Sequence, residues 1–145
     1  MMETIMTIDF KYRLVLGFSG LVAASIGLAI TLDPQAFYTG YGIALTPQPN
    51  LMSELRAPAA NLAALGLIIL AGALNKNLAR SAALLGTTVF SAFAVGRIIS
   101  LVLDGRPSAG VLAALGIEVV LALLCAWVVV QERRKKAGNI PQVTA

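Results

Sequence analysis

Four long apolar runs, at about 13–32, 51–74, 79–103 and 109–130, dominate this chain of 145 residues. Each run is about 20 residues or longer, which is the length an α-helix needs to cross the hydrocarbon core of a bilayer. Charged residues make up only 12% of the chain, against about 25% in average soluble proteins. The runs therefore predict an all-α integral membrane four-helix bundle whose helices run up-down-up-down.

The ends of the runs give the domain organisation. Residues 1–136 are predicted to form a single transmembrane domain, which closes with the polybasic sequence QERRKK at 131–136. Residues 137–145 are predicted to be a disordered cytoplasmic tail, because chain ends without apolar anchors are rarely ordered.

The basic residues predict the orientation in the membrane. Eight of the 11 Lys and Arg residues fall on the side of the two termini and of the connection at 75–77. Because cytoplasmic loops carry the excess of Lys and Arg, both termini are predicted to be cytoplasmic.

The only long connection, residues 34–49, holds Phe37, Tyr38 and Tyr41, with a short helix expected at 34–38. Two interpretations stay open. Tyrosine is enriched at membrane interfaces, so the ring side chains can form an aromatic belt, which is the favoured interpretation. They can also form a lid over a ligand.

Two charges lie inside the last two runs. Arg97 is about 9 Å and Glu118 about 15 Å below the same surface at 1.5 Å per helical residue. A charge within a membrane helix costs about 2.5–3.5 kcal/mol on insertion scales. Since the turn between the two helices is short, the helices are expected to be antiparallel neighbours, and the two side chains to form an ion pair.

Further polar residues fall in the same half of the bundle. The candidate ligand-binding or ion-pair cluster comprises Glu54, Arg56, Asn61, Arg97, Ser100, Asp104, Arg106 and Glu118. Its three acids and three bases allow it to be neutral overall. It can be a polar pocket open to the outside, or an ion-pair network that only fixes helix register.

An internal similarity accompanies this cluster. ELRAPAANLAALG at 54–66 resembles DGRPSAGVLAALG at 104–116. A duplicated helical hairpin would produce it, as would chance agreement between sequences rich in Ala, Leu and Gly.

The composition disfavours most catalytic chemistry. The chain has no histidine and one cysteine, Cys125, so His-based catalysis, His-ligated metals and internal disulfides are excluded. No catalytic residue, metal site or cofactor is predicted. The formal net charge of +4 reflects basic residues at helix ends, so no nucleic-acid partner is expected.

One motif resembles a known family. The run G-R-x-x-S-x-x-x-D-G-x-P-S from Gly96 to Ser108, with the Leu-Arg pair at 55–56 and Glu118, is similar to the bacterial membrane family catalogued as domain of unknown function 4345. The resemblance covers nearly the whole chain and implies four helices, with a more distant kinship to DoxX-like membrane proteins. The aromatic-Gly-Gly segment usual in that family is replaced here by Ala57-Pro58-Ala59-Ala60. The resemblance implies a multi-pass protein of a bacterial inner membrane, and it supplies no activity.

Three functions are compatible with these features. The favoured one is a binding or scaffold protein whose outer-facing polar pocket holds a small amphiphile, a lipid headgroup or a partner helix, which includes a homo-oligomer. The first alternative is a small proton-coupled transporter that uses Glu118. The second alternative is a lipid-modifying enzyme with Glu118 or Glu54 as general acid, which is disfavoured because no nucleophile, metal or cofactor motif accompanies it.

Overall fold

The computed structural model describes residues 2–138. In this part of the chain 85% of the structure is helical and there are no strands. Its elements are α1 (Met2–Leu32), α2 (Pro34–Thr39), α3 (Pro49–Leu74), α4 (Ala79–Leu103) and α5 (Ala109–Gly138). Four of these helices are long and apolar enough to cross a membrane, over the spans Phe10–Leu32, Pro49–Leu74, Ala79–Leu103 and Ala109–Arg134. The predicted all-α membrane architecture is therefore confirmed.

Two helix ends differ from the predicted ones. α1 begins at Met2 rather than near residue 13, and α5 continues to Gly138 rather than ending at Val130. Gln, Glu, Arg and Lys are good helix formers, so a charged segment that leaves the membrane can remain helical. The remainder of the predicted disordered tail lies outside the described residues.

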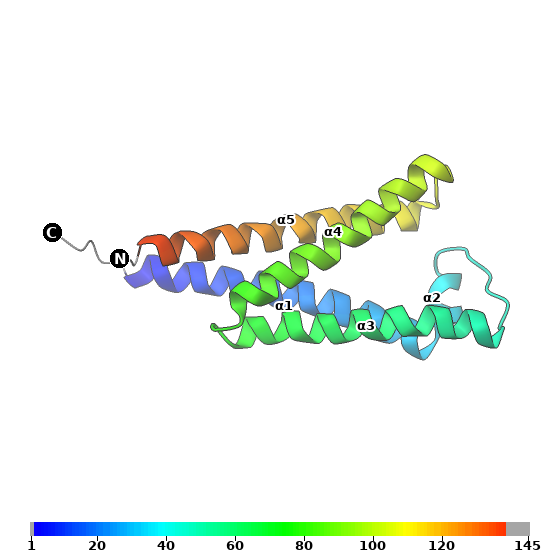
Figure 1. The fold of residues 1–145 in the computed structure, drawn as a ribbon, viewed down its shortest axis with the longest axis horizontal. Helices are drawn as coiled ribbons and strands as arrows, with labels where there is room; N and C mark the ends of the chain where they lie inside the picture. Colours follow the sequence, from blue (N-terminus) through cyan, green and yellow to red (C-terminus); the bar gives the residue numbers. More distant parts are fainter. Residues whose placement is uncertain (1, 139–145) are drawn as a thin grey trace.

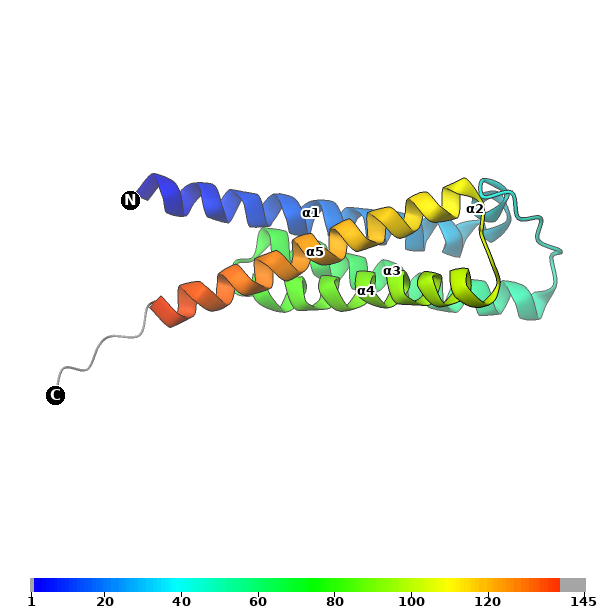
Figure 2. The ribbon, with the colours of Figure 1, turned by 90° about the horizontal axis from the view of Figure 1, so that it is seen from above.

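The long helices form two pairs (Figure 1). α1 packs most extensively against α3, and α4 packs most extensively against α5. The two pairs pack against each other toward the end that holds the start of α1, the end of α5 and the α3–α4 turn, here called the terminal end. They diverge toward the opposite end (Figure 1), which holds α2 and the α4–α5 turn and is here called the α2 end; Figure 2 shows this end from above.

Small residues bring α1 and α3 into backbone contact. A Cβ atom built on Gly20 would meet the backbone of Leu70 and Gly66, and one built on Gly27 would meet the backbone of Ala63 and Ala59. Close approach of this kind is the usual role of small residues between membrane helices.

Two arginines tie the same pair together at its ends. Arg13 donates from Nε to the carbonyl oxygen of Ala73 at 2.9 Å, and Arg56 donates from Nε to that of Thr31 at 3.1 Å. Both acceptors lie in the last turn of a helix, where carbonyl groups have no intrahelical partner. Each arginine therefore caps the neighbouring helix.

The packed core fills the terminal end and the middle of the bundle. One cluster of buried side chains surrounds Leu16, Ile69 and Val128, and a second surrounds Leu62, Phe90 and Leu121. Beyond this level the two pairs separate. This is seen in the burial of their side chains, since α4 has no buried residue after Ala94 and α5 has none before Leu121. The α2 end of the bundle is therefore not packed solid.

Candidate functional site: an apolar cavity at the α2 end

An open cavity of about 940 Å³ lies between the diverging helix pairs. It is lined by side chains from α1, α2, α3, α4 and α5 and from the loop after α2. Nearly all of them are apolar or aromatic: Phe18, Val22, Ala23, Ile26, Ile30, Phe37, Ile43, Leu55, Pro58, Ala59, Leu62, Phe90, Phe93, Val111, Ala113, Ala114, Ile117, Val120, Leu121 and Leu124. The polar side chains of the lining are Tyr38, Tyr41, Arg97 and Glu118.

The charged wall of the cavity is the ion pair between α4 and α5. Nε of Arg97 donates to Oε1 of Glu118 at 2.8 Å and to Oε2 at 2.9 Å. The Arg97 side chain is 32% exposed and that of Glu118 is 12% exposed. The pairing predicted from matched depth and opposite charge is confirmed. Each charge offsets the unfavourable free energy of placing the other among apolar groups.

The geometry of the pair leaves donors available. The hydrogen bonds that Arg97 makes within the described residues all come from Nε. A guanidinium group carries four further N–H bonds on its two terminal nitrogens. Because Arg97 lines the cavity, these donors can bind a ligand that offers oxygen acceptors.

Aromatic rings from α2 and the loop after it line the cavity at the α2 end of the bundle. The ring of Phe37 lies edge-on to that of Tyr38, with centroids 5.5 Å apart, and 5.3 Å from that of Tyr41. Asp33 begins α2 by accepting a hydrogen bond from the backbone N–H of Ala36 at 3.0 Å. The loop therefore holds its rings as one cluster.

Tyr41 extends this cluster to the other helix pair. A Cβ atom built on Gly110, in the first turn of α5, would lie only 3.1 Å from Cδ1 of Tyr41. Gly42 adopts a φ of 76°, a left-handed conformation that glycine accommodates without strain, and it turns the chain immediately after Tyr41. The α2 loop thus spans the opening between the α1–α3 pair and the α4–α5 pair.

The rest of the predicted polar cluster lies away from the cavity. Ser100 donates to Oδ2 of Asp104 at 2.8 Å on the exposed end of α4. Arg56 donates a hydrogen bond to the carbonyl oxygen of Thr31. The remaining predicted residues are exposed and do not line the cavity: Glu54, Asn61 and Arg106. Of the eight predicted residues, the structure brings Arg97 and Glu118 together in the cavity.

Metal binding has no evident position in this arrangement. Among residues 10–134, whose side chains the structure describes, no three His, Cys, Asp or Glu side chains come together in a group that could hold a metal ion. Cys125 is fully buried, and its Sγ–H points to Oγ of Ser19 at 3.5 Å. That contact joins α5 to α1 in the packed middle of the bundle.

The sequence did not reveal the apolar lining. Phe18, Val22 and Phe93 are the same kinds of residue that face lipid elsewhere on these helices. The available signals were the aromatic loop and the two membrane-embedded charges, because both lie at the α2 end.

The four apolar spans and the cavity among them define a multi-pass helical membrane protein. The sequence profile of the family described as Domain of unknown function (DUF4345) matches residues 12–129, so the chain belongs to that family. This confirms the resemblance carried by the motif at 96–108; the kinship to DoxX-like proteins stays a prediction. No curated protein and no solved structure matches the chain.

Proposed function

We propose that this protein binds a long-chain amphiphile from the membrane in the cavity at its α2 end. The observation that carries the proposal is a cavity of about 940 Å³ with apolar walls and one ion pair. Ligand pockets typically enclose about 300–1,000 Å³ and combine apolar walls with a few placed polar groups. The apolar walls would hold the chain, and Arg97 and Glu118 would orient the head.

The location of the cavity supports the same proposal. It lies between helices that span a bilayer, so a lipid can enter it laterally without crossing water. With both termini in the cytoplasm of a bacterial cell, the cavity would open toward the outer leaflet of the inner membrane. The aromatic cluster of the α2 loop would then serve as its lid as well as its interfacial anchor.

The transporter alternative needs a route from the cavity to the terminal end. Two clusters of buried side chains occupy that route, around Phe90 and Leu121 in the middle and around Ile69 and Val128 beyond. This packing favours binding of a ligand in the cavity over transport of a substrate across the membrane.

The proposal is tested by filling the cavity. Ala114 lines it, whereas Ala60 is exposed on the outer surface of α3 and does not. We expect Ala114→Trp to weaken binding of the ligand strongly, because its indole ring would occupy part of the space that the lipid chain needs. Ala60→Trp, with the same change of residue, should bind as the wild type does.

Native mass spectrometry of protein extracted in mild detergent measures the outcome. The wild type and Ala60→Trp should retain amphiphile, and Ala114→Trp should lose most of it. A wild type that retains none, or an Ala114→Trp variant that retains as much as the wild type, would refute the proposal.

A further inference from the structure

Resting on the proposed function, we infer that the cavity selects a lipid with one long chain and an uncharged head of hydroxyl and ester oxygens. Monoacylglycerols are the chemical class that meets this description. The inference follows from the charge and the hydrogen-bonding capacity of the cavity wall.

The charge of the wall is balanced before any ligand enters. Arg97 and Glu118 are the charged residues of the lining, and they are paired at 2.8 and 2.9 Å. An anionic head would approach Glu118 as a like charge, and a cationic head would approach Arg97 as one. Either would leave a net charge among apolar walls, where charges are costly. An uncharged head avoids this cost.

The hydrogen-bonding capacity of the wall requires an oxygen-rich head. The terminal nitrogens of Arg97 are donors only, so they require acceptors. Both oxygens of Glu118 already accept from Arg97 but retain lone pairs for a hydroxyl donor. The hydroxyl groups of Tyr38 and Tyr41, at the α2 end, can donate or accept. A head with ester and hydroxyl oxygens satisfies all of these groups.

The inner part of the cavity suits the chain of such a lipid. Its floor is formed by Val22, Leu62, Phe90 and Leu121, and no polar residue of the lining comes from this level. A single chain that points toward the middle of the bundle would bury its methylene groups there, each stabilised by about 0.8 kcal/mol.

Three probes with the same oleyl-length chain test the selectivity. The full chain is placed in phosphatidylcholine nanodiscs with equal trace amounts of 1-oleoylglycerol, oleyl sulfate and oleyltrimethylammonium, and bound probe is counted by native mass spectrometry. The two charged probes keep their charge at any pH used. The wild type should bind oleoylglycerol at least about tenfold better than either charged probe, which corresponds to about 1.4 kcal/mol.

Glu118→Gln should reverse the order. The substitution keeps the shape of the side chain but leaves the charge of Arg97 unbalanced, so oleyl sulfate should become the preferred probe. Asp104→Asn is the matched control, because Asp104 lies near the same end but outside the cavity and bonds to Ser100. This variant should keep the order of the wild type.

The outcomes separate the two proposals. A wild type that binds oleyl sulfate or oleyltrimethylammonium as well as oleoylglycerol overturns the inference and leaves amphiphile binding intact. A wild type that binds none of the three also overturns the inference, and the proposed function itself is refuted only if the wild type retains no amphiphile after extraction in mild detergent. If Glu118→Gln does not fold, the order in which the wild type binds the three probes still decides whether the cavity selects an uncharged head.

Discussion

At the scale of single residues, Arg97 and Glu118 bind each other through two hydrogen bonds of 2.8 and 2.9 Å. Breaking a buried pair by removing one partner typically costs about 3–5 kcal/mol, because the other charge is left without compensation. Arg97 is 32% exposed, so we expect a loss near the lower limit, about 3 kcal/mol, for Arg97→Met or Glu118→Leu. Denaturation in a detergent titration measures it.

The double variant distinguishes whether the ion pair only stabilises the fold or also recognises the ligand. Arg97→Met combined with Glu118→Leu leaves no charge unpaired and should recover most of the stability lost in the single variants. If the two losses simply add, the residues are not energetically coupled and the ion pair contributes no stability. A stable double variant that no longer binds oleoylglycerol would assign the pair to ligand recognition.

At the scale of the elements, the α1–α3 contact depends on glycine. A Cβ atom on Gly20 would collide with backbone atoms of α3, which cannot move aside as a flexible side chain would. Gly20→Ala should therefore push the helices apart and destabilise the protein by about 1–3 kcal/mol, a typical loss from overpacking. Thermal unfolding in detergent measures the loss.

Gly96→Ala is the matched control for this contact. Gly96 lies in α4, and a Cβ atom there would meet nothing within 4 Å. Since alanine favours the helix more than glycine does, this variant should be neutral or more stable by up to about 1 kcal/mol. Equal unfolding temperatures for the two variants would show that the backbone contact between α1 and α3 does not determine the stability of the protein.

The sequence predicted the helices and the ion pair, but the pocket that it offered was polar, and it could not predict the apolar lining of the cavity. Long uncharged runs specify membrane helices by length alone, and Arg97 and Glu118 are placed at similar depth by the short turn between them. The divergence of the two pairs depends on which helix faces allow backbone contact, as at Gly20 and Gly27. The residues that the divergence exposes to the cavity, such as Val22 and Phe93, have the same chemistry as residues that face lipid.

The similarity between residues 54–66 and 104–116 shows a related limit of prediction from local sequence. Residues 59–66 and 109–116 are both helical and belong to the second helix of each pair. Residues 54–58 are helical as well, whereas 104–108 form the α4–α5 turn. Similar local sequence therefore leads to different backbone structure, because Gly105 takes a φ of 92° and ends the preceding helix.

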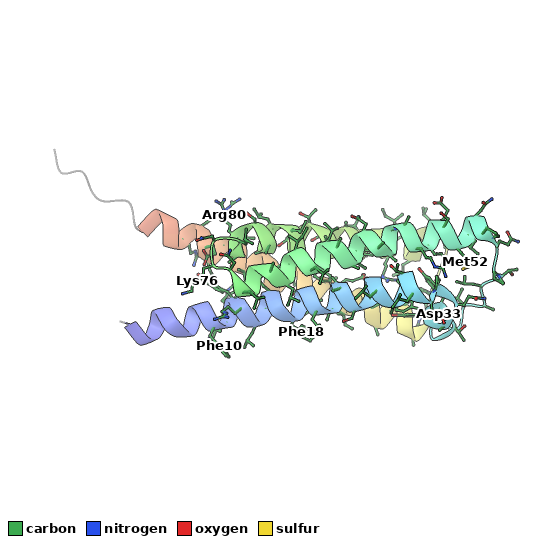
Figure 3. All side chains as sticks on the ribbon, turned by 90° about the horizontal axis from the view of Figure 1, so that it is seen from below. Phe10, Phe18, Asp33, Met52, Lys76 and Arg80 are labelled. Atoms are coloured by element: carbon green, nitrogen blue, oxygen red, sulfur yellow. The ribbon has the colours of Figure 1, made fainter. Side chains whose placement is uncertain are left out.

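At the scale of the whole molecule, the two ends of the bundle differ in charge. Figure 3 places Lys76 and Arg80 at the terminal end and Asp33 and Met52 at the α2 end. Trp127 lies toward the terminal end, edge-on to Tyr12 with centroids 5.4 Å apart, while Tyr38 and Tyr41 lie at the α2 end. Aromatic side chains near both ends of the spans suit the two interfaces of a bilayer.

This asymmetry predicts that the terminal end faces the cytoplasm, because basic residues are retained on that side during insertion. An alkaline phosphatase fused after Ala145 should be inactive in cells, and the same enzyme inserted after Gly105, in the α4–α5 turn, should be active. The reverse result would show the opposite topology, with both termini outside the cytoplasm and the cavity at the inner leaflet. The ligand would then have to come from the cytoplasmic side, and the probes that test the cavity would have to be supplied to that leaflet.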